Sequence, residues 1–115
     1  MNIYLASPGD DANSIMVEEF IRNFDHLLVN KYEGADAMIV LVTDQSADAS
    51  IDVEHYCMSV IDEGITPQIL VLYDVETGLS HQLRQLVNDN DYIVTVCFDN
   101  PQEILENILT FLECI

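Results

Sequence analysis

The sequence contains very few basic residues. Only Arg22, Lys31 and Arg84 are basic, against 21 acidic residues, which gives the 115-residue chain a formal net charge of −18. The acidic residues are spread along the chain, so they are expected on a folded surface and not in a separate acidic tail. Because such a surface repels phosphate groups, we expect no direct binding of DNA or RNA. A solvated acidic surface is the simplest explanation of this charge.

Glycine, proline and long apolar runs are also scarce. The chain has 4 Gly and 3 Pro, and half of its residues are hydrophobic, a composition typical of a globular domain. No apolar run approaches the ~20 residues that a membrane-spanning helix needs, and the first residues lack the pattern of a secretory leader. We therefore expect a single domain over residues 1–115, without membrane contact.

Cysteine and histidine occur without the spacing of a metal or redox site. The three cysteines, Cys57, Cys97 and Cys114, form no CxxC motif, and two of them lie in apolar segments. An odd set of buried thiols is typical of reduced cysteines, so a cytoplasmic location is expected. We assign no metal ligands and expect no cofactor.

Apolar segments alternate with amphipathic ones along the chain. Strands are predicted at 2–6, 37–42, 68–73 and 92–98. Helices are predicted at 13–28, from Ser50 to about Glu63, from Ser80 to Val87, and from the "NPQE" start at Asn100. The expected inward faces of three of these helices are Val17, Phe20, Ile21, Phe24, Leu27 and Leu28; Val53, Cys57, Val60 and Ile61; and Ile104, Leu105, Ile108, Leu109 and Leu112. Residues 26–34 fit either the end of the first helix or a short extra edge strand.

This alternation predicts an α/β fold. We expect a three-layer Rossmann-like or flavodoxin-like sandwich with a four- to five-stranded, mostly parallel sheet and right-handed crossovers. Without the extra edge strand, one face of the sheet would be thinly covered, and the last helix or a second copy of the chain would have to cover it. On this ground we expect a homodimer.

Acidic residues follow the predicted strands, where ligand sites of parallel sheets are found. Asp44 and Asp48 come after the second strand, and Glu54 lies in the first turn or so of the next helix. The helix N-terminus stabilises an ionised carboxylate by roughly 0.3–1 kcal/mol. Two neighbouring carboxylates suit glycosidic chemistry, in which one attacks the anomeric carbon and another handles protons or holds the sugar. Acids are also favoured at helix starts and in loops for structural reasons alone.

Three segments, "IYLASP", "ADAMIVLVTD" and "DASIDVEHYCMSVIDEGITPQILVLYD", resemble the nucleoside 2-deoxyribosyltransferase family. That family opens with a strand similar to "IYLAGP" and continues with a strand preceded by Asp. A "D-x-G-T-x-x-E" stretch then leads into a helix. Asp36, Asp48 and Glu54 occur here in the same order with similar spacing. The resemblance covers roughly residues 2–8 and 35–74.

The resemblance implies a reaction at the N-glycosidic bond of a (deoxy)nucleoside or nucleotide. Glu54 would attack C1′, expel the base and hold the sugar covalently until a second base or water takes it. Asp48 would position the sugar hydroxyls, and Asp36 or a nearby acid would help to handle the proton of the base. The pocket would be lined by Tyr4, Ser7, Asp44 and Ser50. This hypothesis requires that the Glu54 carboxyl opens into a cleft at the edge of the sheet beside Asp48.

The sequence departs from the family at its glycines. Ser7, Ser50 and Tyr56 stand where the family has Gly, and Ile51 stands where Thr is usual. Because Gly lets a ligand approach the backbone, side chains at these positions narrow the pocket. The alternative is therefore a catalytically inactive, highly acidic interaction protein that binds a basic partner. One form of this alternative is a protein whose carboxylates imitate nucleic-acid phosphates.

The acids also allow a third interpretation. Asp10, Asp11 and Asp44 are similar to the acidic pocket of a phosphoacceptor receiver domain, but no Lys follows a later strand. Mg²⁺ among these acids remains compatible with the sequence, because hard cations take oxygen ligands. The single glycine of "SPGDD" does not make a phosphate-binding loop, which disfavours a polyphosphate ligand without a metal.

Overall fold

Strands and helices alternate along the chain as the apolar pattern predicts. The computed structural model describes residues 2–6, 12–24, 27–29, 31–42, 50–64, 66–76 and 78–114. Within these ranges the elements are β1 (Asn2–Ala6), α1 (Ala12–Asn23), β2 (Leu27–Val29), β3 (Ala37–Val42), α2 (Ser50–Asp62), β4 (Ile69–Asp74), α3 (His81–Asp89), β5 (Ile93–Phe98) and α4 (Pro101–Cys114). None of these helices is long and apolar enough to cross a membrane.

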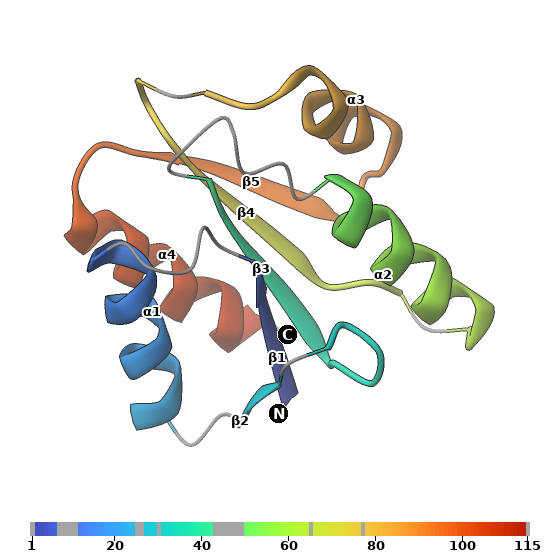
Figure 1. Cartoon of the computed structure of the whole chain (residues 1–115), viewed down its shortest axis with the longest axis horizontal. Helices are drawn as coiled ribbons and strands as arrows, with labels where there is room; N and C mark the ends of the chain where they lie inside the picture. Colours follow the sequence, from blue (N-terminus) through green and yellow to red (C-terminus); the bar gives the residue numbers. More distant parts are fainter. Residues whose placement is uncertain are drawn as a thin grey trace.

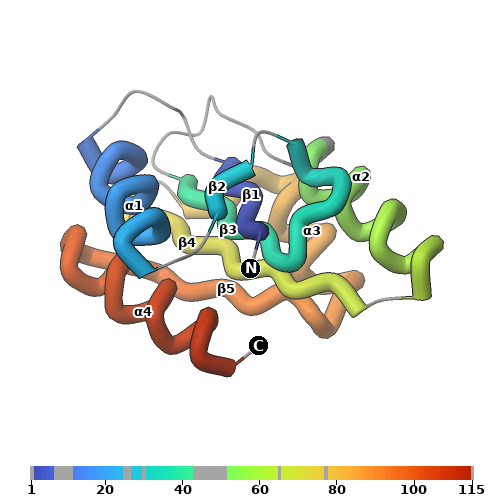
Figure 2. The backbone as a smooth tube through the Cα atoms, turned by 90° about the horizontal axis from the view of Figure 1, so that it is seen from below, coloured from blue at the N-terminus to red at the C-terminus, as the bar shows by residue number. Residues whose placement is uncertain are grey.

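The strands form one parallel sheet in the order β2-β1-β3-β4-β5 (Figure 1). Helices α1 and α4 cover one face of this sheet, and α2 and α3 cover the other (Figure 2). Because β2 and β3 lie on opposite sides of β1, the winding of the chain reverses after β2. The predicted three-layer α/β sandwich with a parallel sheet is thus confirmed, and the sheet has five strands in the described residues.

The segment 26–34, for which the sequence allowed either a helix end or a strand, contains the edge strand β2. Leu27 to Val29 pair with Asn2 to Tyr4 of β1, and α1 ends at Asn23. The predicted helix over 13–28 was therefore too long, because a short apolar strand and the last turn of an amphipathic helix carry the same pattern. With β2 present, the crossovers place helices on both faces of the sheet. The thinly covered face, which was the ground for expecting a homodimer, does not exist.

Two apolar cores lie on the two faces of the sheet. All six residues of β3 are buried, as its uninterrupted apolar run predicts. On the α2 side, Tyr56 belongs to the core although the pattern did not predict it, whereas Ile61 is exposed. The Tyr56 hydroxyl donates a hydrogen bond to the carbonyl oxygen of Ala35 at 3.2 Å. This partner allows a tyrosine to be fully buried.

Side-chain caps start the last two helices where the sequence predicts them. The Ser80 Oγ accepts a hydrogen bond from the Leu83 amide at 3.2 Å, and α3 begins at the next residue. The Asn100 Oδ1 accepts from the Glu103 amide at 3.1 Å, so Asn100 caps α4. The buried residues of α4 are Ile104, Ile108, Phe111 and Leu112, while the predicted Leu105 and Leu109 are only partly buried.

Candidate functional site

The carboxyl edge of the sheet has a step between β1 and β3. β1 ends at Ala6 opposite Val40, and β3 continues for two more residues to Val42. This step lies where the winding reverses, which is the place where sheets of this strand order bind ligands. The segments that follow β1 and β3, residues 7–11 and 43–49, lie outside the described residues. The same holds for four predicted groups, namely Ser7, Asp44, Asp48 and the side chain of Ser50.

A hydrogen bond joins the middle of β1 to the first turn of α2. Tyr4, two residues before the end of β1, faces the α2 layer, and its hydroxyl donates to the Asp52 Oδ2 at 3.3 Å. Both side chains are half-buried. Burial, followed by the negative charge of Asp52, raises the pKa of Tyr4 above its ordinary value of 10.0. Tyr4 therefore keeps its proton at neutral pH and acts as a fixed hydrogen-bond donor.

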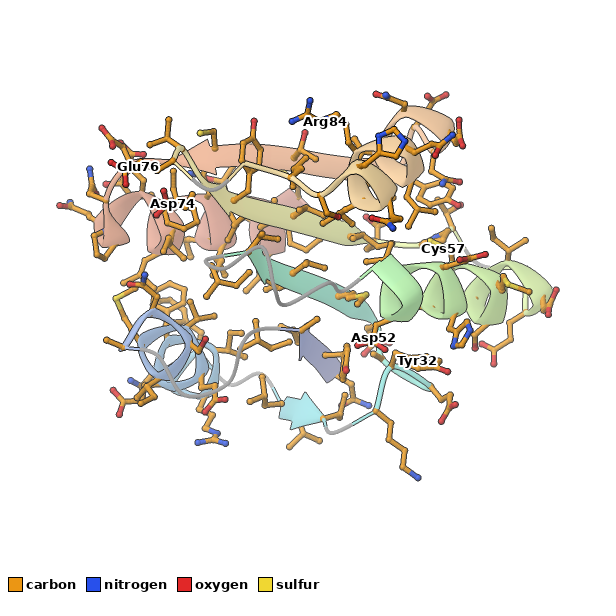
Figure 3. All side chains as sticks on the ribbon, turned by 45° about the horizontal axis from the view of Figure 1, so that its top comes forward. Tyr32, Asp52, Cys57, Asp74, Glu76 and Arg84 are labelled. Atoms are coloured by element: carbon orange, nitrogen blue, oxygen red, sulfur yellow. The ribbon has the colours of Figure 1, made fainter. Side chains whose placement is uncertain are left out.

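A second polar pair stands beside the first. Tyr32 belongs to the segment that connects β2 to β3, and its hydroxyl lies 3.3 Å from the Nδ1 of His55. The Tyr32 ring meets the Tyr4 ring edge to face, with centroids 6.2 Å apart, and lies 6.0 Å from the His55 ring. Figure 3 shows Tyr32 next to Asp52 at the start of α2. We call Tyr4, Tyr32, Asp52 and His55 the tyrosine–aspartate cluster.

Glu54, the predicted nucleophile, lies on another flank of α2. Two residues along an α-helix correspond to a rotation of about 200°, so Glu54 points away from the side on which Asp52 meets Tyr4. Its side chain is exposed. Burial, with a smaller contribution from the charge of Glu54, raises the pKa of the Cys57 thiol. The structure thus brings Asp52, and not Glu54, to the predicted pocket residue Tyr4.

Asp52 is the residue that the sequence reasoning missed as a site residue. A signal was present, because Asp52 stands four residues before Tyr56 and one before Val53, both of which are buried. This spacing places Asp52 at the border of the inward face of α2. The border was not recognised because Tyr56 was expected to narrow a pocket and not to pack in the core.

Asp36, predicted to help with the proton of the base, lies at the opposite edge of the sheet. Its carboxylate Oδ2 accepts a hydrogen bond from the Asn2 amide at 2.7 Å, and its own amide donates to the Asn2 carbonyl at 2.7 Å. Both residues stand at the amino ends of their strands. Asp36 therefore fixes the start of β1 against β3, and no hydrogen bond is described between it and the tyrosine–aspartate cluster.

Of the three cysteines, which the sequence predicted to be buried, Cys97 and Cys114 are exposed and only Cys57 is buried. Cys57 is buried, and its raised pKa favours the protonated thiol. Its neighbour Tyr92 donates a hydrogen bond to the Asn90 Oδ1 at 2.7 Å, and burial raises the pKa of Tyr92 to about 12. Among the described residues, no group of three or more His, Cys, Asp or Glu side chains is arranged to hold a metal ion.

Comparisons with known proteins inform on the fold. No protein-family model matches the sequence, and no curated protein matches it. The solution NMR structure of a de novo designed Rossmann 2x3 fold protein is similar, with a TM-score of 0.59 and 17% sequence identity over 97% of this chain and 88% of that chain. At this identity the likeness concerns the fold alone. The chain therefore has a Rossmann-like α/β fold, and its activity has to be argued from the site.

Proposed function

We propose that this chain is a nucleoside 2-deoxyribosyltransferase-like protein that acts on the N-glycosidic bond of a (deoxy)nucleoside or nucleotide. The covalent role that the sequence assigned to Glu54 belongs in this proposal to Asp52. The observation that carries the proposal is the 3.3 Å hydrogen bond from the Tyr4 hydroxyl to the Asp52 carboxylate. It joins residues 48 positions apart and orients a half-buried carboxylate near the paired rings of Tyr4 and Tyr32.

The chemistry is a double displacement. Asp52 Oδ2 is held by Tyr4, which leaves Oδ1 to attack C1′ of the sugar. As the C1′–O bond forms, the C1′–N bond breaks, and the base leaves with the bonding electron pair and takes up a proton. A second base or a water then attacks C1′ and displaces the carboxylate. Two successive displacements split one difficult substitution into two easier ones and retain the configuration at C1′.

The remaining members of the cluster support binding. Tyr4 and Tyr32 are half-buried and expose aromatic surface against which a base can pack, and the His55 ring extends this surface. Asp48 keeps its predicted role of positioning the sugar hydroxyls, and Ser7, Asp44 and Ser50 keep their predicted roles in lining the pocket. The net charge of −18 favours an uncharged nucleoside over a highly phosphorylated substrate.

The test is an assay of base release and base exchange. Purified protein is incubated with a panel of deoxynucleosides and deoxynucleotides, with and without acceptor bases, and the products are separated by chromatography. Turnover should disappear in Asp52→Asn, together with the glycosyl adduct seen by intact mass after rapid quenching. Glu63→Gln serves as the control, because Glu63 is an exposed glutamate just beyond the end of the same helix.

The activities of two variants show whether Asp52 or Glu54 is the nucleophile. Activity retained in Glu54→Gln and lost in Asp52→Asn supports the proposal. Activity lost only in Glu54→Gln would return the covalent role to Glu54. The absence of turnover by the wild-type protein over the whole panel would contradict the enzymatic proposal.

Exposure of the acids favours a second function. Among the described residues no Asp or Glu side chain is buried, and Glu54 is exposed. We propose as the alternative a catalytically inactive protein whose carboxylates bind a basic protein partner, in the manner of nucleic-acid phosphates. Labelled protein should then bind a Lys/Arg-rich peptide with an affinity that falls steeply with added salt, and duplex DNA should compete. Binding that does not respond to salt would contradict this alternative.

A further inference from the structure

The outer edge of β2 carries the features of an interface. Among the strands that the structure describes, β2 is the last of the sheet and pairs only with β1, so its other side presents backbone N–H and C=O groups to a further strand. The strand consists of three apolar residues, and Leu27 is 61% exposed. Phe24, just after α1, is 48% exposed. Apolar surface and unpaired strand edge thus coincide.

The exposed apolar side chains flank this edge on both faces of the sheet. Leu28 packs with the core under α1, and Val29 packs with the core under α2. Because side chains alternate along a strand, Leu27 lies on the same face as Val29. Phe24 lies on the α1 side, where its ring stacks on Phe20 with centroids 4.7 Å apart. A protein that lies along the edge would therefore contact both layers.

The sequence stretch that contains β2 differs in net charge from the rest of the chain. Two of the three basic residues, Arg22 and Lys31, flank the strand, and both are exposed. The stretch 22–33 also contains two acids, Asp25 and Glu33, and is therefore neutral. The other residues carry 19 acids and one base, which is the whole net charge of −18.

We infer that the edge of β2 binds a second copy of this chain, with β2 paired antiparallel to its counterpart about a two-fold axis. Two copies with a charge of −18 each repel one another through most of their surfaces, and the neutral stretch is where this repulsion is weakest. An axis at the middle residue places Leu27 opposite Val29 of the partner subunit, which makes apolar cross-strand pairs. The sheet then continues through both subunits.

This interface differs from the usual protection of an edge strand. Short strands and nearby lysines do discourage strand pairing. Protected edges, however, present charged or polar side chains, whereas β2 presents Leu27 and adds Phe24 beside it. A basic partner is disfavoured at this surface, because Arg22 and Lys31 would repel it. The inference therefore uses other residues than either proposed function and does not depend on them.

The test measures self-association by sedimentation and light scattering between about 1 and 100 µM, the range in which modest protein interfaces dissociate. The wild type should form dimers, and added salt should strengthen them by screening the residual repulsion. Leu27→Glu should raise the dissociation constant at least about tenfold, because it places two carboxylates in the interface. Met58→Glu is the matched control, since Met58 is 59% exposed on α2.

Charge reversal at the flank provides a second pair of variants. Lys31→Glu should weaken the dimer severalfold, whereas Arg84→Glu, which reverses the only basic residue outside the neutral stretch, should leave it unchanged. Hydrogen exchange should slow at residues 27–29 as the protein concentration rises. A wild type that is monomeric at about 100 µM in high salt overturns the inference. So does an equal effect of Met58→Glu, or exchange at β2 that does not depend on concentration.

Discussion

The acids at and after the ends of β4 and β5 and the acid at the start of α2 are used in different ways. The Asp74 Oδ1 accepts a hydrogen bond from the Glu76 amide, and a Glu103 side-chain oxygen accepts from the Asp99 amide. These partners are two and four residues away, so the acids shape a turn and a helix start. The partner of Asp52 is Tyr4, 48 residues earlier in the sequence. Figure 3 shows Asp74 and Glu76 at one end of the sheet and Asp52 away from them.

An acidic residue that follows a strand is therefore not by itself evidence of a functional site. Asp and Glu are frequent at strand ends and helix starts because they bond to nearby backbone amides. Such a bond satisfies local structure and carries no implication for catalysis. A carboxylate that is oriented by a side chain of another element is held in a geometry that local structure does not require. This contrast singles out Asp52 as the functional candidate.

The sharpest way to break the contrast is to remove one hydrogen-bonding side chain from each region. Tyr4→Phe should lower kcat by roughly 100-fold, because the Asp52 carboxylate loses its fixed orientation. Asp74→Ala should leave kcat unchanged and reduce the free energy of unfolding by about 0.5–1 kcal/mol through loss of its turn. Steady-state kinetics and urea unfolding measure both effects. Equal kinetic losses in the two variants would show that the two groups of acids do not differ in role.

A second comparison concerns two tyrosine hydroxyls near α2. Tyr56→Phe should cost about 1–3 kcal/mol of unfolding free energy, because the buried carbonyl of Ala35 loses its partner. Tyr92→Phe should cost less, because Tyr92 is only half-buried and bonds to the side chain of Asn90. Urea unfolding of both variants tests this order, and a larger loss in Tyr92→Phe would contradict it.

The same tyrosines predict a loss of stability at alkaline pH. Burial, followed by the negative charge of Asp36, raises the pKa of Tyr56 from 10.0 to about 12. The folded protein therefore holds this proton more tightly than the unfolded chain does. The resulting stability is fully present below pH 10 and is lost as the pH rises to about 12. Thermal unfolding under reducing conditions should show this decline, and the decline should be smaller in Tyr56→Phe than in the wild type.

The smallest expected effect tests a local cap. Asn100→Ala should lower the free energy of unfolding by about 1 kcal/mol, because the Glu103 amide loses its acceptor at the start of α4. Gln102→Ala is the control, since Gln102 is exposed and its side-chain bond to Glu106 lies on the helix surface. Neither change should alter catalysis. If Gln102→Ala lowered the free energy of unfolding as much as Asn100→Ala, the stabilising role of the Asn100 cap would be contradicted.

Local patterns predicted most of the fold. The four strands that the sequence predicted begin and end within one residue of their predicted limits, because buried parallel strands require uninterrupted apolar runs. Ser80 and Asn100 start helices as predicted, because capping uses residues within three positions of one another. Residues 26–34 could not be assigned, since three apolar residues fit a helix end as well as a strand. Residues 27–29 form a strand because they pair with β1, which is distant in sequence.

The site was less predictable than the fold. The sequence predicted that Glu54, in the first turns of α2, would act in a pocket lined by Tyr4, and it did not single out Asp52. The choice of Asp52 over Glu54 depends on which neighbour stands at each flank of the helix. Helical periodicity predicts which face of α2 is buried. It does not predict that β1 lies beside the flank of α2 that carries Asp52. Asp44, Asp48 and Ser7 remain sequence predictions, because they lie outside the described residues.

The amino-acid sequence by itself determined the layers of this protein, the ends of most elements and the acidic surface, because these depend on hydrophobic periodicity, nearby capping groups and composition. Tertiary structure alone decided three things: the edge strand β2, the burial of Tyr56, and the pairing of Asp52 with Tyr4. Each of these depends on contacts between residues more than 20 positions apart, whose energies no local window of sequence contains.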